Sequence, residues 1–122
     1  MKNKLILVAE DDKALSRILT LKLENEGYEV ILALDGQEAL NLIKERKPNL
    51  VLLDLIMPVK NGFEVLEELQ KEKTNTPIIV LSNLGQEEDI KKSKDLGAKD
   101  YFIKSEIDLS AVVEKINTFL KT

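Results

Sequence analysis

Apolar and polar residues alternate along the chain in short blocks, and five of the apolar blocks resemble buried strands. They are rich in branched side chains and are closed by charged residues or by turn-forming residues. This pattern is typical of strands covered on both faces. The predicted strands are Lys4–Ala9, Tyr28–Leu34, Leu50–Leu53, Ile78–Leu81 and Lys99–Ile103.

The segments that follow these strands show apolar residues at helical spacing. Gly27, Pro48 and Gly97 end three of the predicted helices, and Asp35 and Asp108 are predicted N-caps. The apolar positions that define the four regular helices are Leu15, Ile18, Leu19 and Leu23; Ala39, Leu40 and Ile43; Val65, Leu66 and Leu69; and Leu109, Val112, Val113, Ile116 and Leu120.

The helix predicted over Gln86–Leu96 is the weakest, because Ile90 and Leu96 are its only large apolar residues. With it, five strands alternate with five helices. Such alternation predicts an α/β fold with a parallel sheet, right-handed crossovers and helices on both faces, which is a doubly wound (βα)5 three-layer sandwich. We find no linker, repeat or low-complexity segment, so we expect one domain over residues 1–122.

Residues able to do chemistry stand at the ends of four predicted strands. Glu10, Asp11 and Asp12 follow the first strand and Asp54 follows the third, while the other two ends are at Ser82 and Lys104. All strands of a parallel sheet end at the same edge, which is where ligands bind in open α/β sheets. We therefore expect these side chains to converge, with Asp54 as the first candidate for function.

Composition narrows the chemistry that this edge can perform. The chain contains no Cys and no His, which excludes disulfides, thiol nucleophiles, serine–histidine triads and histidine phosphoacceptors. Its net charge of -4, with lysines interleaved among acids, argues against direct nucleic-acid binding. No apolar stretch approaches the roughly 20 residues of a membrane span. We expect a cytoplasmic protein with no membrane contact.

Carboxylates crowded at one edge repel one another unless a cation or solvent balances them. Oxygen ligands of this kind suit Mg²⁺, which takes one or two carboxylates from a protein and keeps several waters. A carboxylate can also act as a nucleophile toward phosphorus. Lys104, the hydroxyl of Ser82 and a metal ion are suitable partners for the transferred group's oxygens.

In this order, these motifs resemble the receiver domain of bacterial two-component response regulators over essentially all 122 residues. The resemblance rests on Glu10-Asp11-Asp12, on DLIMP at Asp54–Pro58 with the later Gly62, on Ser82 and on Lys104. It implies a flavodoxin-like sheet of order 2-1-3-4-5. It also implies a phosphoacceptor signalling domain rather than an enzyme, although self-phosphorylation from small donors and slow autodephosphorylation are expected.

The resemblance implies a role for each residue of the edge. Asp54 would accept a phosphoryl group from a sensor histidine kinase or a histidine phosphotransfer protein, and Ser82 and Lys104 would bind that group. Tyr101 would be the switch aromatic that follows Ser82. The implied ligands of Mg²⁺ or Mn²⁺ are Asp11, Asp54, the backbone carbonyl of Ile56 and, through a water, Glu10.

A phosphoryl group brings more charge and more acceptor oxygens than a carboxylate, so it favours conformations in which its partners come closer. The weakly apolar Gln86–Leu96 helix is the element expected to move. We predict that it forms the partner-binding face together with Lys99–Ile103 and Asp108–Leu120, for a downstream protein, an output domain or a phosphorylation-dependent dimer.

Two positions depart from the family pattern. Ser105 follows Lys104 where the family has proline after a cis peptide, so the peptide here is either a strained cis bond or trans. Asn83 stands after Ser82 where the family has a small residue, and it could hinder or orient the water that removes the phosphoryl group.

Three other readings compete. A phosphatase of the haloacid-dehalogenase type would need a second Asp where this chain has Ile56. A nucleotide- or flavin-binding module would need a glycine-rich phosphate loop, which the five glycines do not form. A receiver-like module could bind partners while accepting phosphate poorly or not at all. The sequence does not decide whether the domain stands alone or belongs to a longer chain.

Overall fold

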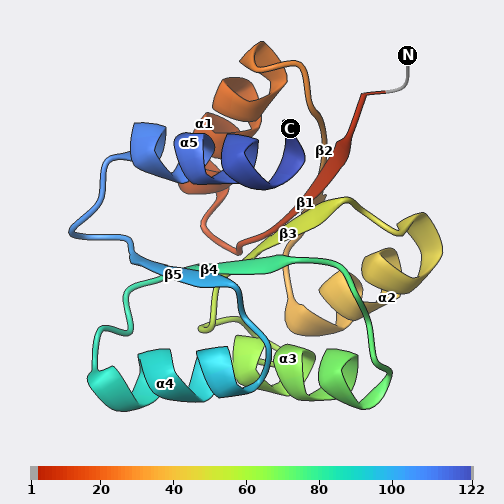
Figure 1. The fold of residues 1–122 in the computed structure, drawn as a ribbon, viewed down its shortest axis with the longest axis vertical. Helices are drawn as coiled ribbons and strands as arrows, with labels where there is room; N and C mark the ends of the chain where they lie inside the picture. Colours follow the sequence, from red (N-terminus) through yellow and green to blue (C-terminus); the bar gives the residue numbers. More distant parts are fainter. Residues whose placement is uncertain (1–2, 122) are drawn as a thin grey trace.

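The computed structural model describes residues 3–121, which form five strands and five helices in strict alternation (Figure 1). The elements are β1 (Leu5–Ala9), α1 (Lys13–Asn25), β2 (Glu29–Ala33), α2 (Gly36–Arg46), β3 (Leu50–Leu53), α3 (Gly62–Lys71), β4 (Ile78–Ser82), α4 (Glu87–Asp95), β5 (Asp100–Ile103) and α5 (Leu109–Leu120).

The strands form one parallel sheet of order β2-β1-β3-β4-β5, which confirms the predicted topology. Its register aligns the carboxyl ends of the central strands, because Ala9 of β1 pairs with Leu53 of β3 and Leu53 pairs with Val80 of β4. The residues that follow β1 and β3 therefore leave the sheet side by side. The order of the strands reverses between β1 and β3, and in doubly wound sheets ligands bind at the carboxyl ends of the strands at such a point.

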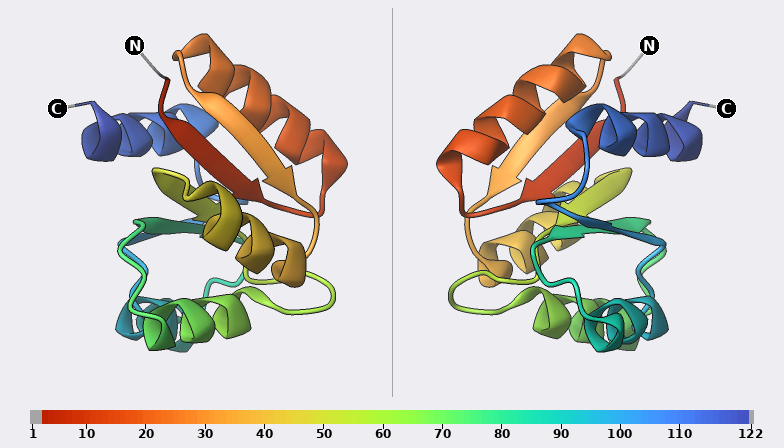
Figure 2. Two further views of the ribbon diagram at one scale, coloured as in Figure 1. Left: turned by 90° about the vertical axis from the view of Figure 1, so that its right-hand side faces the viewer. Right: turned by 90° about the vertical axis from the view of Figure 1, so that its left-hand side faces the viewer.

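The helices cover both faces of the sheet, so the fold has three layers (Figures 1 and 2). Helices α1 and α5 pack on one face, and α2, α3 and α4 lie on the other. Successive strand residues face opposite layers, so each strand contributes to both cores. The core beneath α1 and α5 includes Ile6, Leu19, Leu52 and Ile116, and the other includes Leu7, Leu40, Val51 and Leu66.

Side-chain caps fix where several helices begin. Asp35 Oδ1 accepts a hydrogen bond from Glu38 N at 2.8 Å, and Asp108 Oδ1 accepts one from Ser110 N at 2.9 Å, which confirms both predicted N-caps. Asn61 and Glu64 form a capping box at the start of α3. The Asn-x-x-Glu spacing of these two residues is a sequence signal for the start of a helix.

Apolar periodicity overestimated burial at one side of the fold. Ile18 and Leu21 of α1 are exposed although the sequence around them has helical spacing, and so are Leu32 and Leu34. The predicted strand Tyr28–Leu34 is shorter in the structure and lies at an edge of the sheet. Pattern alone does not say which strand is peripheral, so it does not say which apolar residues lack a covering layer.

Candidate acidic site at the carboxyl edge of the sheet

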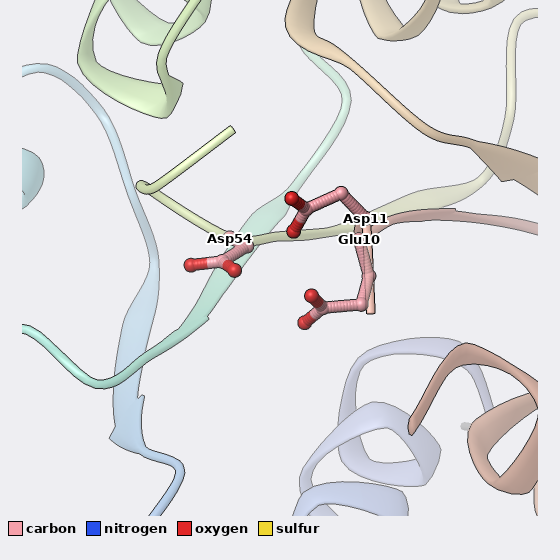
Figure 3. A group of neighbouring side chains, drawn as sticks. All are labelled: Glu10, Asp11 and Asp54. Atoms are coloured by element: carbon pink, nitrogen blue, oxygen red, sulfur yellow. The ribbon is translucent and has the colours of Figure 1, made fainter. Parts of the chain in front are cut away.

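Three carboxylates meet where β1 and β3 end (Figure 3). Glu10 and Asp11 follow β1 and Asp54 follows β3, and one oxygen from each lies within 4.8 Å of the others. Glu10 and Asp54 are only 3% and 5% exposed, whereas Asp11 is exposed. The cluster is therefore open to solvent on the side of Asp11 and enclosed on the sides of the other two acids.

Backbone hydrogen bonds hold these acids in place. Asp54 N donates to Ala9 O at 3.0 Å, and Glu10 N donates to Ala33 O at 3.0 Å, so the residues after both strands continue the sheet's ladder. A Cβ atom on Gly62 would come within 2.6 Å of the Asp54 carbonyl oxygen. Glycine at this position therefore allows α3 to begin directly against the backbone of Asp54.

Asp12, the third acid after β1, does not belong to the cluster. Its Oδ1 accepts hydrogen bonds from Ala14 N at 3.0 Å and Leu15 N at 3.1 Å, which makes it the N-cap of α1. Its own backbone N–H donates to Glu10 Oε2 at 3.0 Å. Of the three acids in this loop, Asp12 caps α1, and Glu10 and Asp11 belong to the cluster.

Lys104 reaches the same cluster from the end of β5. Its Nζ lies 2.5 Å from Glu10 Oε1 and 2.8 Å from Asp54 Oδ2, and its side chain is largely buried. The Lys104 backbone N–H donates to Ser82 O at 2.9 Å, which fixes the end of β5 beside β4. One ammonium group therefore bridges two enclosed carboxylates.

The protonation of the site follows from burial and charge. Burial raises the pKa of Glu10, and the hydrogen bond from Lys104 offsets only part of that effect. Burial alone would lower the pKa of Lys104, but its hydrogen bonds and charge interactions with Asp54 and Glu10 outweigh burial and raise it. At neutral pH Lys104 is a cation held between two acids. An ion that binds at this cluster would therefore change the partners of the Lys104 ammonium group.

Ser82 and Tyr101 are linked through the backbone of one residue, Leu84. Ser82 is fully buried, and its Oγ accepts a hydrogen bond from Leu84 N at 3.4 Å. The hydroxyl of Tyr101 donates to the carbonyl oxygen of Leu84. The hydroxyl at the end of β4 and the aromatic ring on β5 therefore share the segment that leads to α4.

The loop between β3 and α3 lies against the start of α2. Ile56 N donates to Asp54 Oδ1 at 3.1 Å, while the Ile56 side chain is exposed. Val59 has a left-handed backbone, with φ of 67°, which is unusual for a β-branched residue. A Cβ atom added to Gly36 would lie 2.0 Å from the Lys60 carbonyl oxygen. Glycine at position 36 therefore allows this loop to lie directly against the start of α2.

The two departures from the family pattern have definite positions. Among residues 3–121 no peptide bond is cis, so Lys104 is followed by a trans peptide and still reaches both acids. Asn83 is exposed, and it lines a cleft with Asp12, Leu15, Lys104 and Ser105. Asn83 is therefore a solvent-exposed residue of a cleft that it shares with Lys104.

The arrangement fits a divalent cation of the hard, oxygen-preferring kind. It offers three carboxylates from two neighbouring strand ends, with one side open for the waters that Mg²⁺ retains. It also presents an enclosed carboxylate, Asp54, beside a largely buried cation, Lys104. Those are the components needed to receive and hold a small anionic group.

Comparison with known proteins gives concordant matches. The profile of the response regulator receiver domain matches residues 6–117. A probable transcriptional regulator ycf27 of Porphyridium aerugineum is 45% identical over 104 residues, covering 85% of this chain and 43% of the relative. The alkaline phosphatase synthesis transcriptional regulatory protein PhoP of Bacillus subtilis is 40% identical over 102 residues, covering 84% and 42%.

Solved structures show the same likeness in three dimensions. The receiver domain of the Francisella response regulator 1452 superposes with a TM-score of 0.90 at 32% identity, covering 96% of each chain. The chain spans less than half the length of the two relatives named above. Within residues 3–121, no helix has both the length and the apolar character needed to cross a membrane.

Proposed function

The chain belongs to the response regulator receiver domain family, and from that premise we propose that it is a phosphoacceptor whose acceptor residue is Asp54. The family is a signalling domain and not a classical enzyme. The observation that carries the proposal is the position of Asp54, which is enclosed, bonded to Lys104 and clustered with Glu10 and Asp11.

The proposed reaction is a single phosphoryl transfer. A carboxylate oxygen of Asp54 attacks the phosphorus of a phosphohistidine on a partner kinase or phosphotransfer protein. The new O–P bond forms as the P–N bond breaks, and the imidazole leaves with the electron pair. The product is an acyl phosphate on Asp54 and an unmodified histidine on the donor. The chain has no histidine of its own, so the phosphoryl donor lies outside these 122 residues.

Lys104, which already contacts Asp54, and Ser82, at the end of the neighbouring strand β4, would hold the product. Lys104 Nζ, now 2.8 Å from Asp54 Oδ2, would remain as the cationic partner of a phosphoryl oxygen. The Ser82 hydroxyl would donate to another oxygen after leaving Leu84 N. Phosphorylation adds charge and acceptor oxygens, so these partners gain contacts only when the group is present.

Mg²⁺ or Mn²⁺ fits the same cluster. Asp11 and Asp54 would be direct ligands with the backbone carbonyl of Ile56, and Glu10 would act through a bound water. When bound, the ion supplies positive charge that offsets the repulsion among the acids and the incoming phosphoryl oxygens. The exposed position of Asp11 leaves an entry path for the ion from solvent.

We propose that the switch passes through Leu84. Its N–H is bonded to Ser82 Oγ and its carbonyl accepts from Tyr101, so a Ser82 hydroxyl that turns toward a phosphoryl group frees one of these bonds. The segment that leads into α4 can then shift together with Tyr101. The resulting partner face is formed by residues Gln86–Leu96, Lys99–Ile103 and Asp108–Leu120.

The partners of this face depend on the full-length protein. Two relatives are named transcriptional regulators and are more than twice as long as their matched part. We propose that an output segment outside this chain makes any contact with DNA, because the domain itself is acidic overall. In this proposal the domain itself binds the kinase and the output segment, and the output segment binds DNA.

Intact mass spectrometry tests the acceptor. The purified protein is incubated with acetyl phosphate and Mg²⁺, and with each component omitted in turn. We expect one phosphoryl adduct per chain that requires Mg²⁺, and its loss in Asp54→Asn. Asp11→Asn should reduce the yield at limiting Mg²⁺ and recover part of it when Mg²⁺ is raised.

Asp12→Asn is the matched control, because Asn caps a helix about as well as Asp and Asp12 lies outside the cluster. It should form the adduct at the normal yield. An adduct that persists in Asp54→Asn would show that another residue is the acceptor. Multiple turnover of generic phosphate esters would indicate a phosphatase, and no adduct in the wild type would indicate a binding module without phosphoryl chemistry.

A further inference from the structure

The edge strand β2 leaves exposed apolar side chains and an unpaired strand edge next to each other. β2 pairs with β1 and with no other strand of residues 3–121. Glu29 N and Ala33 O bond toward β1, so the alternating peptide groups of Val30 and Leu32 face outward. An open strand edge of this kind is a template for another strand.

An apolar groove runs beside this open edge. Its floor is formed by Leu32 and Leu34, which are 38% and 40% exposed, and its wall is formed by Leu21 of α1, which is 58% exposed. Lys13, Ser16, Arg17 and Thr20 line the rest of the groove, which has a volume of about 330 Å³. In the left view of Figure 2, α1 and β2 lie side by side along this edge. A contiguous apolar patch marks an interaction site more often than scattered exposed residues do.

The charges along the edge are divided by sign. Lys13 and Arg17 flank the groove near the carboxyl end of β2, whereas Glu24 and Glu29 flank the cleft near its amino end. Within residues 3–121, none of these four side chains takes part in an ion pair. The edge thus has a basic end and an acidic end, both without internal partners in the described part of the chain.

We propose that this edge binds a second copy of the same chain, with the two β2 strands antiparallel about a twofold axis. Such an axis, perpendicular to the sheet, places both α1 helices on the same face. The basic end of one copy then meets the acidic end of the other, with Arg17 opposite the partner's Glu24. The three exposed leucines of each copy become covered, and the outward peptide groups of Val30 and Leu32 gain partners.

The position of Arg46, a further charged residue at this edge, is consistent with the same arrangement. Arg46, at the end of α2, borders the acidic end of β2 from the other face of the sheet. In the antiparallel dimer it lies toward the first turn of the partner's α2, which carries Glu38. A single acidic helix docked along α1 in the groove would satisfy the basic end but would place its charge against Glu24. Self-complementarity therefore favours a second copy.

This association lies at the opposite edge of the sheet from β5 and uses no residue of the acidic cluster, so it should not depend on phosphorylation. Sedimentation velocity of the unphosphorylated protein over a concentration series tests it. The wild type should show a monomer–dimer equilibrium that persists in Asp54→Asn. Arg17→Glu and Glu24→Arg should each raise the dimer dissociation constant by at least about tenfold, because each creates two like-charge contacts across the axis.

Mixing the two variants gives the sharpest result. In a dimer of Arg17→Glu with Glu24→Arg both contacts are of opposite sign, so the mixture should recover dimer that neither variant forms alone. Lys22→Glu and Ile18→Glu are the matched controls on the same helix, because neither residue lines this groove, and both should dimerise like the wild type. A monomeric wild type, or a dimer that none of the edge variants weakens, would overturn the proposal and leave the Asp54 chemistry untouched.

Discussion

Helices α4 and α5 flank the same edge strand, β5, yet the fold holds them in very different ways. Four apolar residues of α5 are buried, namely Val112, Val113, Ile116 and Leu120. In α4 the only buried residue is Ser93, whose hydroxyl bonds to the carbonyl of Ile90 in the same helix. Each fully buried Val, Leu or Ile contributes roughly 1.5–3 kcal/mol, so α5 is firmly anchored and α4 is not.

Polar contacts follow the same division. Asp108 caps α5, the hydroxyl of Tyr28 donates to Asn117 Oδ1 at 2.5 Å, and Lys115 pairs with Asp100 at 3.1 Å. By contrast, Gln86 caps α4 without a side-chain hydrogen bond. The α4 helix is held to α3 by Lys92 over the ring of Phe63 at 4.4 Å and by Gln70 Nε2 donating to the Asp95 carbonyl at 3.1 Å.

The difference indicates which element a phosphoryl group can move. Reversing a two-state population from 1:99 to 99:1 requires roughly 5.5 kcal/mol of differential binding. A few new hydrogen bonds to a charged group can supply energy of that order. They can move an element only if its displacement exposes little buried apolar surface. The α4 helix meets that condition because it buries almost no apolar surface, whereas a displacement of α5 would uncover part of the core.

The largest expected effect is on stability. Ile116→Ala in α5 should lower the free energy of unfolding by about 2–5 kcal/mol, because it leaves a cavity in the core. Ile90→Ala in α4 should cost less than about 1 kcal/mol, because Ile90 is only half-buried. Urea denaturation of both variants measures the two values. Equal losses would show that α4 is anchored as firmly as α5.

A smaller effect is expected where α4 joins the sheet. Tyr101→Phe removes the hydroxyl that donates to Leu84 and should cost about 1 kcal/mol at neutral pH. Burial, and then the charges of Asp89 and Asp54, raise the pKa of Tyr101 from 10.0 to about 12. The unfolded chain therefore releases this proton first, so the stabilising effect is complete below pH 10.0 and is lost as the pH rises toward about 12.

Urea denaturation from pH 9 to 12 should accordingly show a steeper loss of stability in the wild type than in Tyr101→Phe. Tyr28→Phe provides a direct optical check, because Tyr101 is then the only tyrosine left of the two. The absorbance of the Tyr101 phenolate should appear only at a pH well above 10.0, the ordinary pKa of tyrosine. A Tyr101 that titrates near 10.0 would mean that its ring and hydroxyl are solvated, contrary to the contacts described.

The smallest expected effect concerns the tether between α4 and α3. Lys92→Ala removes the ammonium group from the Phe63 ring and should cost about 0.5–1 kcal/mol. Amide hydrogen exchange in α4 should become faster while exchange in α5 stays the same. Lys94→Ala is the control, because Lys94 is an exposed lysine of the same last turn. Slower or unchanged exchange in α4 would contradict the tether.

Much of this fold could be predicted because alternating strands and helices allow few arrangements. The convergence of Glu10, Asp54, Ser82 and Lys104 at one edge follows from a parallel sheet, since every strand ends on the same side. The weakness of α4 was also visible, because its segment has few apolar residues. In both cases a local pattern and the global topology lead to the same expectation.

Other features depend on contacts between distant residues and could not be read from the pattern. The sequence did not reveal which of the three acids after β1 caps α1, or that Lys104 bridges Glu10 and Asp54. The contact that requires Gly36 involves a loop more than twenty positions away. Ile18 has the spacing of a core residue in the sequence, yet it is 46% exposed in the structure.

The central claim is that a phosphoryl group on Asp54 moves α4 through Ser82 and Leu84. The most direct test compares backbone amide NMR shifts before and after phosphorylation, in the wild type and in Ser82→Ala, with the adduct verified by mass in each. We predict that shifts in the wild type reach α4 and Tyr101 and that Ser82→Ala confines them to the loops around Asp54. Wild-type shifts confined to those loops, or a Ser82→Ala pattern identical to the wild type, would contradict the account.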